Sequence, residues 1–179
     1  TVPLARYVAQ YQRELVFPFR RYQIQKVWRG ERPQSGRFRE FYQCDIDVIG
    51  DGTLSLLTDA EMPAVIYQIF SEMGVGPFMI RINNRKIVQG LLSWIGVAEK
   101  DFTVVMRVLD DLEKSGLDRC IVSLKGLGIS EELARKVLTL VGRKFSASSA
   151  LQELESLGCS ESLYLEGVQE LNTVLEGVL

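Results

Sequence analysis

The chain has 179 residues, of which 46% are hydrophobic and 25% are charged, with a formal net charge of −2. This composition is typical of a folded domain with its own hydrophobic core and argues against disorder. No apolar run approaches the roughly 20 residues that cross a bilayer, so no membrane partner is expected. Because the sequence contains no histidine, Ser-His-Asp and Cys-His sites and histidine-ligated metals are excluded within it.

The three cysteines, Cys44, Cys120 and Cys159, are far apart and include no CxxC pair. An odd number with this spacing indicates reduced thiols, and it predicts neither a disulfide framework nor a zinc site. We therefore expect a small buried apolar side chain at each of the three positions, a cytoplasmic protein and no protein-bound metal.

Charge is distributed unevenly along the chain. Residues 1–43 carry nine Lys and Arg against three Asp and Glu, whereas residues 44–179 carry twelve against twenty. A basic first quarter on a mildly acidic protein favours one local anion-binding site over a general nucleic-acid-binding surface. A solvated basic face accounts for the same composition, and charge alone does not separate the two.

The first fifty residues predict a short helix followed by a β-hairpin. Residues 1–11 have a helical pattern with apolar side chains on one side. Residues 17–29 and 38–50 alternate in the manner of strands, and each strand has one polar face. Glycine and proline in residues 30–36 place a loop between them. The strands are therefore expected to pair antiparallel around a long tip.

The remainder of the chain predicts helices and one further strand. A helix is expected from about Thr58 to Gly74, a third strand over residues 77–83 and another helix over residues 85–96. From about Ala98, successive segments show helical periodicity, and most of them end in glycine. The predicted fold class is α+β, an antiparallel sheet portion followed by a small all-helical portion.

Four arginines flank the loop of the expected hairpin: Arg29, Arg32, Arg37 and Arg39. The planar guanidinium group suits phosphate oxygens and stays charged at any working pH. Several arginines on one loop can hold a polyphosphate and stabilise charge that develops on phosphorus. Neither GxxxxGK[ST] nor GxGxxG occurs, so the phosphate sites of P-loop and Rossmann proteins are excluded. A solvated basic hairpin tip is the alternative.

The second strand of the hairpin has an unusual polar face, which carries Phe41, Gln43, Asp45 and Asp47. An ordinary amphipathic strand turns such a face to water. An aromatic ring beside an amide and two carboxylates can equally line a pocket, in which the ring stacks a base and the polar groups bind an amine or an imidazole. Carboxylates near arginines suit an amino acid beside a nucleotide, and the residues alone leave both interpretations open.

Residues 28–50, "WRGERPQSGRFREFYQCDIDVIG", resemble motif 2 of the class II aminoacyl-tRNA synthetases, and in detail that of the histidyl-tRNA synthetase family. The Arg-x-Glu-Arg-Pro-Gln, Gly-Arg-aromatic-Arg-Glu-Phe and Gln-Cys-Asp-x-Asp runs are all intact. "TVPLARYVA" and "INNRKIVQGLL" resemble the segments that flank this region in the family. The resemblance covers essentially the whole chain, more loosely over the last eighty or so residues.

This resemblance implies a partial class II antiparallel-sheet catalytic core over residues 1–96, a helical insertion domain over residues 97–158 and a helix leading back to the core over residues 159–179. It also implies a histidine–tRNA ligase activity: ATP-dependent activation of histidine to histidyl-adenylate, then transfer to tRNA(His). The implied cofactors are ATP and Mg²⁺. The full-length protein would be a cytoplasmic homodimer.

The resemblance also assigns roles to individual residues. Arg29 would be catalytic, binding the α-phosphate of ATP and stabilising the transition state. The remaining ATP contacts would be Glu31 at the adenine, Phe41 stacked on it and Arg37 at the β- and γ-phosphates. Gln43 and Asp47 would bind histidine, with Thr1 near its amino group. Gln34 at the loop tip is a weaker candidate for contact with the tRNA acceptor end.

Two alternatives to an active synthetase follow from the same sequence. The first is a catalytically silent relative such as the regulatory subunit of ATP phosphoribosyltransferase, although such proteins usually lose the arginines and glutamate of motif 2. The second is an ordinary αβ domain with a basic hairpin. In the helical portion, basic side chains either meet tRNA backbone or form a solvated face; they are Lys125, Arg135, Lys136, Arg143 and Lys144.

The sequence lacks the motif 1, the motif 3 arginine and the anticodon-binding domain that the resemblance implies for a complete synthetase. We therefore expect these 179 residues, taken alone, to be inactive or very weak in histidine adenylation. ATP–pyrophosphate exchange on the isolated segment measures this. A normal exchange rate without the motif 3 arginine would contradict the expectation.

Overall fold

A computed structural model describes residues 2–30 and 32–178 and divides the chain into two compact units, Thr1–Thr58 and Asp59–Leu179. Thr1, the first residue of the expected helix, lies outside the described residues. The first unit contains α1 (Val2–Tyr11), β1 (Phe19–Trp28) and β2 (Glu40–Ile49). The sequence predicts boundaries after residues 96 and 158, between the catalytic core, the insertion domain and the returning helix. The division into compact units does not test these boundaries, so they stay a prediction.

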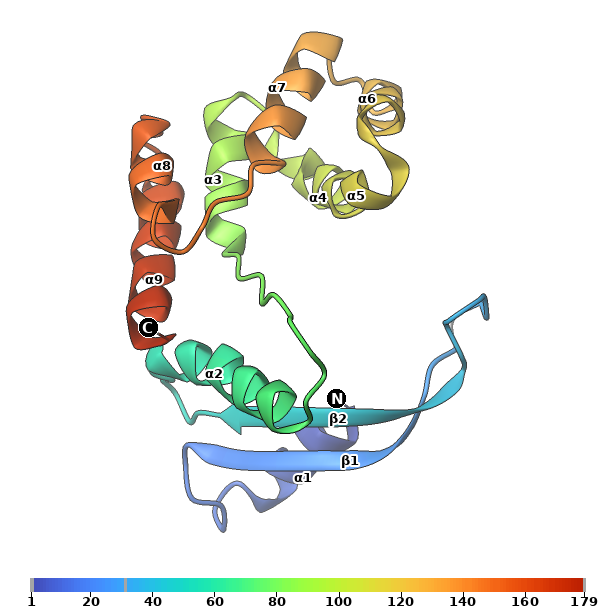
Figure 1. The fold of residues 1–179 in the computed structure, drawn as a ribbon, viewed down its shortest axis with the longest axis vertical. Helices are drawn as coiled ribbons and strands as arrows, with labels where there is room; N and C mark the ends of the chain where they lie inside the picture. The colour runs from blue at the N-terminus through green and yellow to red at the C-terminus, as the bar shows by residue number, and fades with distance from the viewer. Residues whose placement is uncertain (1, 31, 179) are drawn as a thin grey trace. The chain divides into compact units, whose positions relative to one another are not determined.

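The predicted hairpin forms, with β1 and β2 paired antiparallel from Phe19 opposite Ile49 to Trp28 opposite Glu40 (Figure 1). Alternating side chains drive this pairing, because every second residue can share a face with its cross-strand partner. At the tip, the backbone groups of Gln34 and Arg37 bond to each other in both directions, at 3.2 and 2.9 Å. Gly36 closes this turn at φ +74°, a left-handed conformation that favours glycine.

The two faces of the hairpin differ in character and in exposure. Tyr22 and Tyr42 on the outer face are 79% and 70% exposed, and Ile24 and Trp28 beside them are also exposed. The opposite face is polar, and most of its side chains are half-buried. An ordinary amphipathic strand would turn its polar face to water. In this unit the polar face of the hairpin is instead the less exposed of its two faces.

Two expectations about the first hundred residues are wrong. Residues 77–83 form no strand in the described chain, although they run extended up to α3 (Figure 1). A strand is defined by hydrogen bonds to a neighbour, and these residues pair with none of the described ones. Cys44 is exposed because it lies on the outer face of β2, whereas Cys120 and Cys159 are buried as expected.

The second unit is helical, and its elements follow the glycine-punctuated periodicity of the sequence. They are α2 (Leu57–Glu72, which starts at the boundary between the units), α3 (Arg85–Trp94), the 3₁₀ helix η1 (Glu99–Asp101), α4 (Phe102–Asp110), α5 (Leu112–Ser115), α6 (Leu117–Gly126), α7 (Glu131–Val141), α8 (Ala150–Ser156) and α9 (Ser162–Val178). None of the described helices is long and apolar enough to cross a membrane.

Helix α3 contributes to both hydrophobic cores of this unit. Val88 and Leu92 belong to a core shared with α4, α6 and α7. Ile87 and Leu91 belong to a core shared with α8 and α9, in which Tyr164 is buried and its hydroxyl donates to the carbonyl of Leu154 at 2.7 Å. Burial of this ring raises the pKa of Tyr164 to about 12.

The packing of α3 against α9 depends on glycine on both helices (Figure 1). A Cβ at Gly90 would lie 2.6 Å from the backbone nitrogen and the Cβ of Tyr164. A Cβ at Gly167 would lie 2.7 Å from the backbone nitrogen of Ile87. Since backbone atoms and Cβ atoms, which cannot swing aside, are among the clashing atoms, the helices would have to separate to admit a methyl group.

We predict that Gly90→Ala lowers the free energy of unfolding by about 1–3 kcal/mol, the usual cost of overpacking a tight contact. Gly126→Ala is the matched control, because its Cβ meets no atom within 4 Å and lies in a helix. That substitution should be neutral or stabilising by up to about 1 kcal/mol. Urea unfolding measures the free energy of unfolding of both variants. If Gly90→Ala were as stable as Gly126→Ala, the close-contact argument would be contradicted.

An ion-pair cluster also joins α3 and α9. The ammonium group of Lys86 donates to Glu166 at 2.6 Å and to Glu170 at 2.5 Å, and the amide of Asn84 donates to Glu170 at 2.8 Å. The bonds from Lys86 and Asn84 hold the pKa of Glu170 below its ordinary value. The same cluster raises the pKa of Lys86, chiefly through Glu166.

Because the pKa of Glu170 is lowered in the folded state, its contribution to stability is complete above its ordinary pKa and is lost as the pH falls through the lowered value. We predict that Glu170→Gln flattens the loss of melting temperature on acidification below about pH 5. Lys86→Met should reduce the same acid-induced loss of melting temperature, since it removes the ion-pair partner of Glu170. If both variants lost melting temperature on acidification as the parent does, the cluster would not stabilise the fold.

Candidate functional site

The hairpin brings the two predicted polar strand faces together on one surface. Residues directly opposite in an antiparallel pair share a face. The register therefore places four cross-strand pairs in a row: Arg21 with Asp47, Gln23 with Asp45, Gln25 with Gln43, and Val27 with Phe41. The sequence predicted each face separately, and the register shows which residues meet.

One end of this face carries the groups expected to bind ATP. The guanidinium carbon of Arg29 lies 5.1 Å from the centre of the Phe41 ring, within the range of a cation–π contact. The backbone N–H of Arg29 donates to the carbonyl of Arg39 at 2.9 Å and extends the pairing by one step beyond the strands. An aromatic ring and a cation are thus adjacent, as stacking a base beside its phosphates requires.

The middle of the face is oriented by a short amide–carboxylate bond. Nε2 of Gln43 donates to Oδ1 of Asp45 at 2.5 Å. Because a carboxylate accepts hydrogen bonds, the amide NH₂ of Gln43 faces Asp45, and Oε1 of Gln43 stays directed elsewhere as an acceptor. Oε1 of Gln43 can therefore accept a hydrogen bond from an amine or an imidazole N–H.

The other end of the face holds an ion pair. Nη2 of Arg21 lies 2.5 Å from Oδ2 of Asp47, and Nη1 donates to Oε1 of Gln23 at 2.7 Å. Among the described residues, Arg21 Nε and Asp47 Oδ2 are nevertheless buried without a hydrogen-bond partner, so the close approach has ion-pair distance but not hydrogen-bond angles. An unsatisfied buried polar group costs about 1–3 kcal/mol, so stability does not explain this pair.

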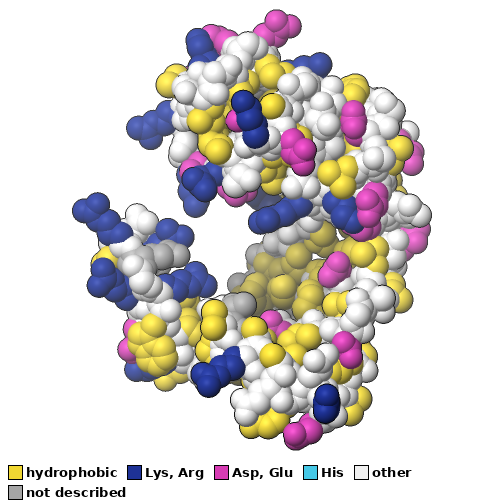
Figure 2. All heavy atoms as spheres, turned by 180° about the vertical axis from the view of Figure 1, so that it is seen from behind, with side chains coloured by type: hydrophobic (Ala, Val, Ile, Leu, Met, Phe, Trp, Pro, Cys, Tyr) yellow, Lys and Arg dark blue, Asp and Glu magenta, His cyan; other side chains and the backbone are white. Residues whose placement is uncertain are grey.

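The hairpin tip presents the remaining expected residues. Arg29, Arg32, Arg37 and Arg39 are all exposed, and Figure 2 shows Lys and Arg side chains gathered at the tip on the left. Gln34 and Arg37 lie in the tip turn, beyond the ends of both strands. Glu31 and Thr1 lie outside the described residues, so their expected contacts with adenine and with the amino group of histidine are not placed.

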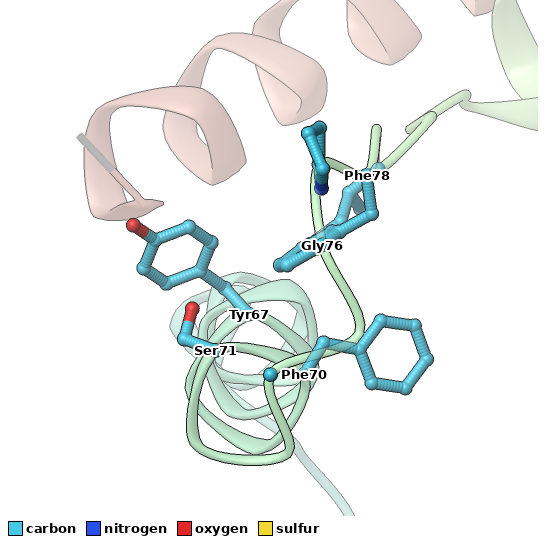
Figure 3. Close-up of a pocket in the computed structure, with 8 residues that line it drawn as sticks. Tyr67, Phe70, Ser71, Gly76 and Phe78 are labelled. Carbon is cyan, nitrogen blue, oxygen red and sulfur yellow. The ribbon is translucent and has the colours of Figure 1, made fainter.

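Apart from the hairpin face, a hollow of about 580 Å³ lies at the end of α2 (Figure 3). The rings of Phe70 and Phe78 meet edge to face with their centroids 5.3 Å apart, and the centroid of the Tyr67 ring lies 5.7 Å from that of Phe78. No Lys, Arg, Asp or Glu is among the described residues that line it. The hollow therefore lacks the charged groups that a nucleotide or an amino acid needs, and the hairpin face is the candidate site.

Most basic side chains named for the helical portion already have partners. Lys125 and Arg135 both pair with Glu131, at 2.7 and 3.0 Å, and Lys144 pairs with Glu113. Lys136 lies over the ring of Trp94 at 5.6 Å. These contacts favour the solvated-face interpretation, because an RNA phosphate would have to compete with a carboxylate already in place.

The sequence predicted a polar face on the first strand, but sequence reasoning assigned no role to Arg21 or Gln23. The signal that could have identified Arg21 was its position opposite Asp47, which depends on the exact register. Strand parity gives the face of a residue and leaves its partner undetermined.

Comparison with known proteins gives consistent results. The family model described as "Histidyl-tRNA synthetase" matches residues 1–178. A histidine–tRNA ligase of Clostridium tetani is 47% identical over 175 residues, covering 98% of this chain and 39% of the relative. One of Xylella fastidiosa is 50% identical over 184 residues, covering 98% and 40%. The chain thus spans about two fifths of the length of these relatives.

Two solved structures extend the comparison. A histidyl-tRNA synthetase from Nostoc superposes with a TM-score of 0.89 at 40% identity, covering 99% of this chain and 41% of that one. A Bacillus halodurans protein, described as an ATP phosphoribosyltransferase regulatory subunit/histidyl-tRNA synthetase, superposes with a TM-score of 0.74 at 22% identity, covering 99% and 44%. At that identity the second match shows the shared fold alone.

Proposed function

Because the chain belongs to the histidyl-tRNA synthetase family, we propose that it supplies the motif 2 part of a histidine–tRNA ligase, which activates histidine with ATP and transfers it to tRNA(His). The observation that carries this proposal is the hairpin face. It places an aromatic–guanidinium pair, Arg29 and Phe41, at one end and an amide–carboxylate surface at the other. A nucleotide and an amino acid need these two chemistries side by side.

In the proposed reaction the carboxylate of histidine attacks the α-phosphorus of ATP. The bond from that phosphorus to the bridging oxygen breaks, and histidyl-adenylate and pyrophosphate form. The 3′-terminal ribose hydroxyl of tRNA(His) then attacks the activated carbonyl and releases AMP. The nucleophiles come from the two substrates, so the protein needs neither a histidine nor a cysteine nucleophile, and positioning with electrostatic stabilisation is its main contribution.

The residues divide this work between the two ends of the face. Arg29 would bind the α-phosphate and stabilise the charge that grows on it in the transition state. Phe41 would stack on the adenine, Arg37 on the tip turn would hold the β- and γ-phosphates, and Glu31 would contact the adenine. Gln43 and Asp47 would accept hydrogen bonds from histidine, with Thr1 near its amino group.

Mg²⁺ would reach such a site on the triphosphate. In the described part of the chain no three Asp, Glu, Cys or His side chains lie together in a group able to hold a metal ion. The chain's residues therefore fit a metal bound to ATP rather than one in a protein cage. The ion would neutralise part of the negative charge of the triphosphate.

The proposed partners are histidine, ATP and tRNA(His), with Gln34 at the tip as a weaker contact to the tRNA acceptor end. Homodimerisation and a cytoplasmic location belong to the same proposal for the full-length protein. A regulatory relative without catalysis is the second candidate, but the 22% match that suggests it carries the fold alone. The intact motif 2 arginines and the 47–50% identity to histidine–tRNA ligases favour the enzyme.

The test is ATP–pyrophosphate exchange on the longest natural form of this gene product, with each of the twenty amino acids in turn. We predict exchange with histidine only, and a fall of about 10²–10³-fold on Arg29→Ala, the loss typical of one transition-state-stabilising group. Lys26→Ala is the matched control, because it removes a nearby cation of β1 that pairs with Glu40 on the outer face. It should change exchange little.

Three results would contradict parts of the proposal. A folded protein that exchanges with no amino acid would identify a silent relative, and the hairpin face would then be a ligand-sensing surface. Exchange with an amino acid other than histidine would reject the specificity assigned to Gln43 and Asp47. Equal losses in Arg29→Ala and Lys26→Ala would remove the transition-state role from Arg29.

A further inference from the structure

We propose that Arg21 is a positioning residue for the amino acid: it orients the carboxylate of Asp47 without touching the substrate. This inference rests on the proposed function, in which Asp47 binds histidine. It assigns a role to a residue that lies outside the motif 2 pattern, eight positions before Arg29.

The location of Arg21 separates it from the arginines of the loop. Eight residues of strand at about 3.3 Å each put its Cα roughly 26 Å from that of Arg29. Its side chain is 16% exposed, whereas the four arginines around the loop are exposed residues. A phosphate held by Arg29 is therefore out of reach of Arg21, and a second phosphate-binding role does not fit.

The contacts of Arg21 fix its guanidinium group at two points. Nη2 lies 2.5 Å from Oδ2 of Asp47, its direct cross-strand neighbour, and Nη1 donates to Oε1 of Gln23 at 2.7 Å. The close approach of this ion pair is at Oδ2 of Asp47. Since the Asp47 side chain is 37% exposed, a substrate can still approach its carboxylate.

Charge gives Arg21 a second effect on the same carboxylate. Asp45 and Asp47 lie two residues apart on one face, so their Cα atoms are roughly 7 Å apart and their negative charges repel. Arg21 is the cation opposite Asp47 in the register. It offsets this repulsion before the substrate arrives, so that Asp47 does not have to turn away from Asp45 and lose its aim at the ligand.

The hydrogen bonding of the pair is incomplete. Within the described chain, Arg21 Nε and Asp47 Oδ2 lack a hydrogen bond despite being buried. A strand built only for stability would place apolar or fully bonded side chains there. An incompletely hydrogen-bonded pair fits a carboxylate that binds a ligand and is supported by a cation. The cation orients the carboxylate and leaves part of its hydrogen-bonding capacity for the ligand.

The experiment measures ATP–pyrophosphate exchange on the longest natural form of the gene product with Arg21→Gln. We expect the KM for histidine to rise about ten- to a hundredfold, the effect of losing one charge-assisted contact, with the KM for ATP and kcat within about twofold. Arg21→Lys, which restores the charge without the fork, should recover part of the loss. Lys26→Gln, which breaks an ion pair on the outer face, should leave both KM values unchanged.

Histidinol sharpens the test because it keeps the amine and the imidazole of histidine and lacks the carboxylate. If Asp47 contacts the amine or the imidazole, Arg21→Gln should raise the inhibition constant of histidinol by the same factor as the KM for histidine. A change in the KM for histidine without a change for histidinol would overturn the assignment, since the lost contact would then involve the carboxylate of the substrate.

The remaining outcomes separate this inference from the proposed function. A parent protein with no histidine-dependent exchange overturns both. An active parent whose Arg21→Gln variant keeps the KM for histidine, or loses histidine and ATP affinity equally, overturns this inference alone, the latter indicating a structural role. If Arg21→Gln shows no cooperative unfolding, Arg21→Lys decides: a raised KM for histidine at unchanged KM for ATP supports positioning, and an equal change in both rejects it.

Discussion

The candidate site depends on the antiparallel register of β1 and β2. A shift of the pairing by one residue would move every side chain of one strand to the other face, because side chains alternate with a period of two. Asp47 would then lose Arg21, and Phe41 and Gln43 would face away from their partners. On the outer face, Glu40 accepts from both Lys26 at 2.7 Å and Trp28 at 2.9 Å. These two bonds lower the pKa of Glu40 and keep it charged beside Lys26.

The two compact units solve different physical problems. The helical unit gains its stability from burial, with two hydrophobic cores on α3 and glycine contacts that let α3 and α9 approach closely. The hairpin unit half-buries a polar face instead and leaves Tyr22 and Tyr42 on the other side exposed. A surface with the proposed role of binding charged ligands cannot be optimised for burial at the same time, because each buried charge needs a partner. The ion pair of Arg21 and Asp47 is one consequence of that conflict.

Sequence reasoning recovers what local patterns determine. The alternation in residues 17–29 and 38–50 was enough to predict the hairpin and its polar face, and both are confirmed. Gly116 and Gly128, at φ +79° and +84°, end helical segments where the pattern predicted a stop. The site roles of Arg29, Phe41 and Gln43 come from a resemblance and stay predictions. The geometry adds only the cross-strand partners of those side chains.

What sequence reasoning missed depends on partners distant in the sequence. Residues 77–83 have the composition of a strand, yet a strand needs hydrogen bonds to a neighbour, and composition does not supply that neighbour. Cys44 was expected inside because cysteine is usually buried, but its position in β2 puts it on the outer face. Arg21 is the same kind of case. Its charge was visible, and its ion pair with Asp47 required the register.

The absence of histidine from the chain agrees with the chemistry proposed for it. Acid–base catalysis by imidazole is useful where a weak nucleophile must lose a proton near neutral pH. In adenylation the nucleophile is a carboxylate that is already ionised, and the barrier comes mainly from bringing anions together and stabilising a crowded phosphorus. Fixed guanidinium groups meet that need better than a titrating ring, because they carry their charge at any working pH. A face with arginine at both ends, one beside an aromatic ring and one behind a carboxylate, therefore fits the electrostatics and the aim that the proposed reaction requires.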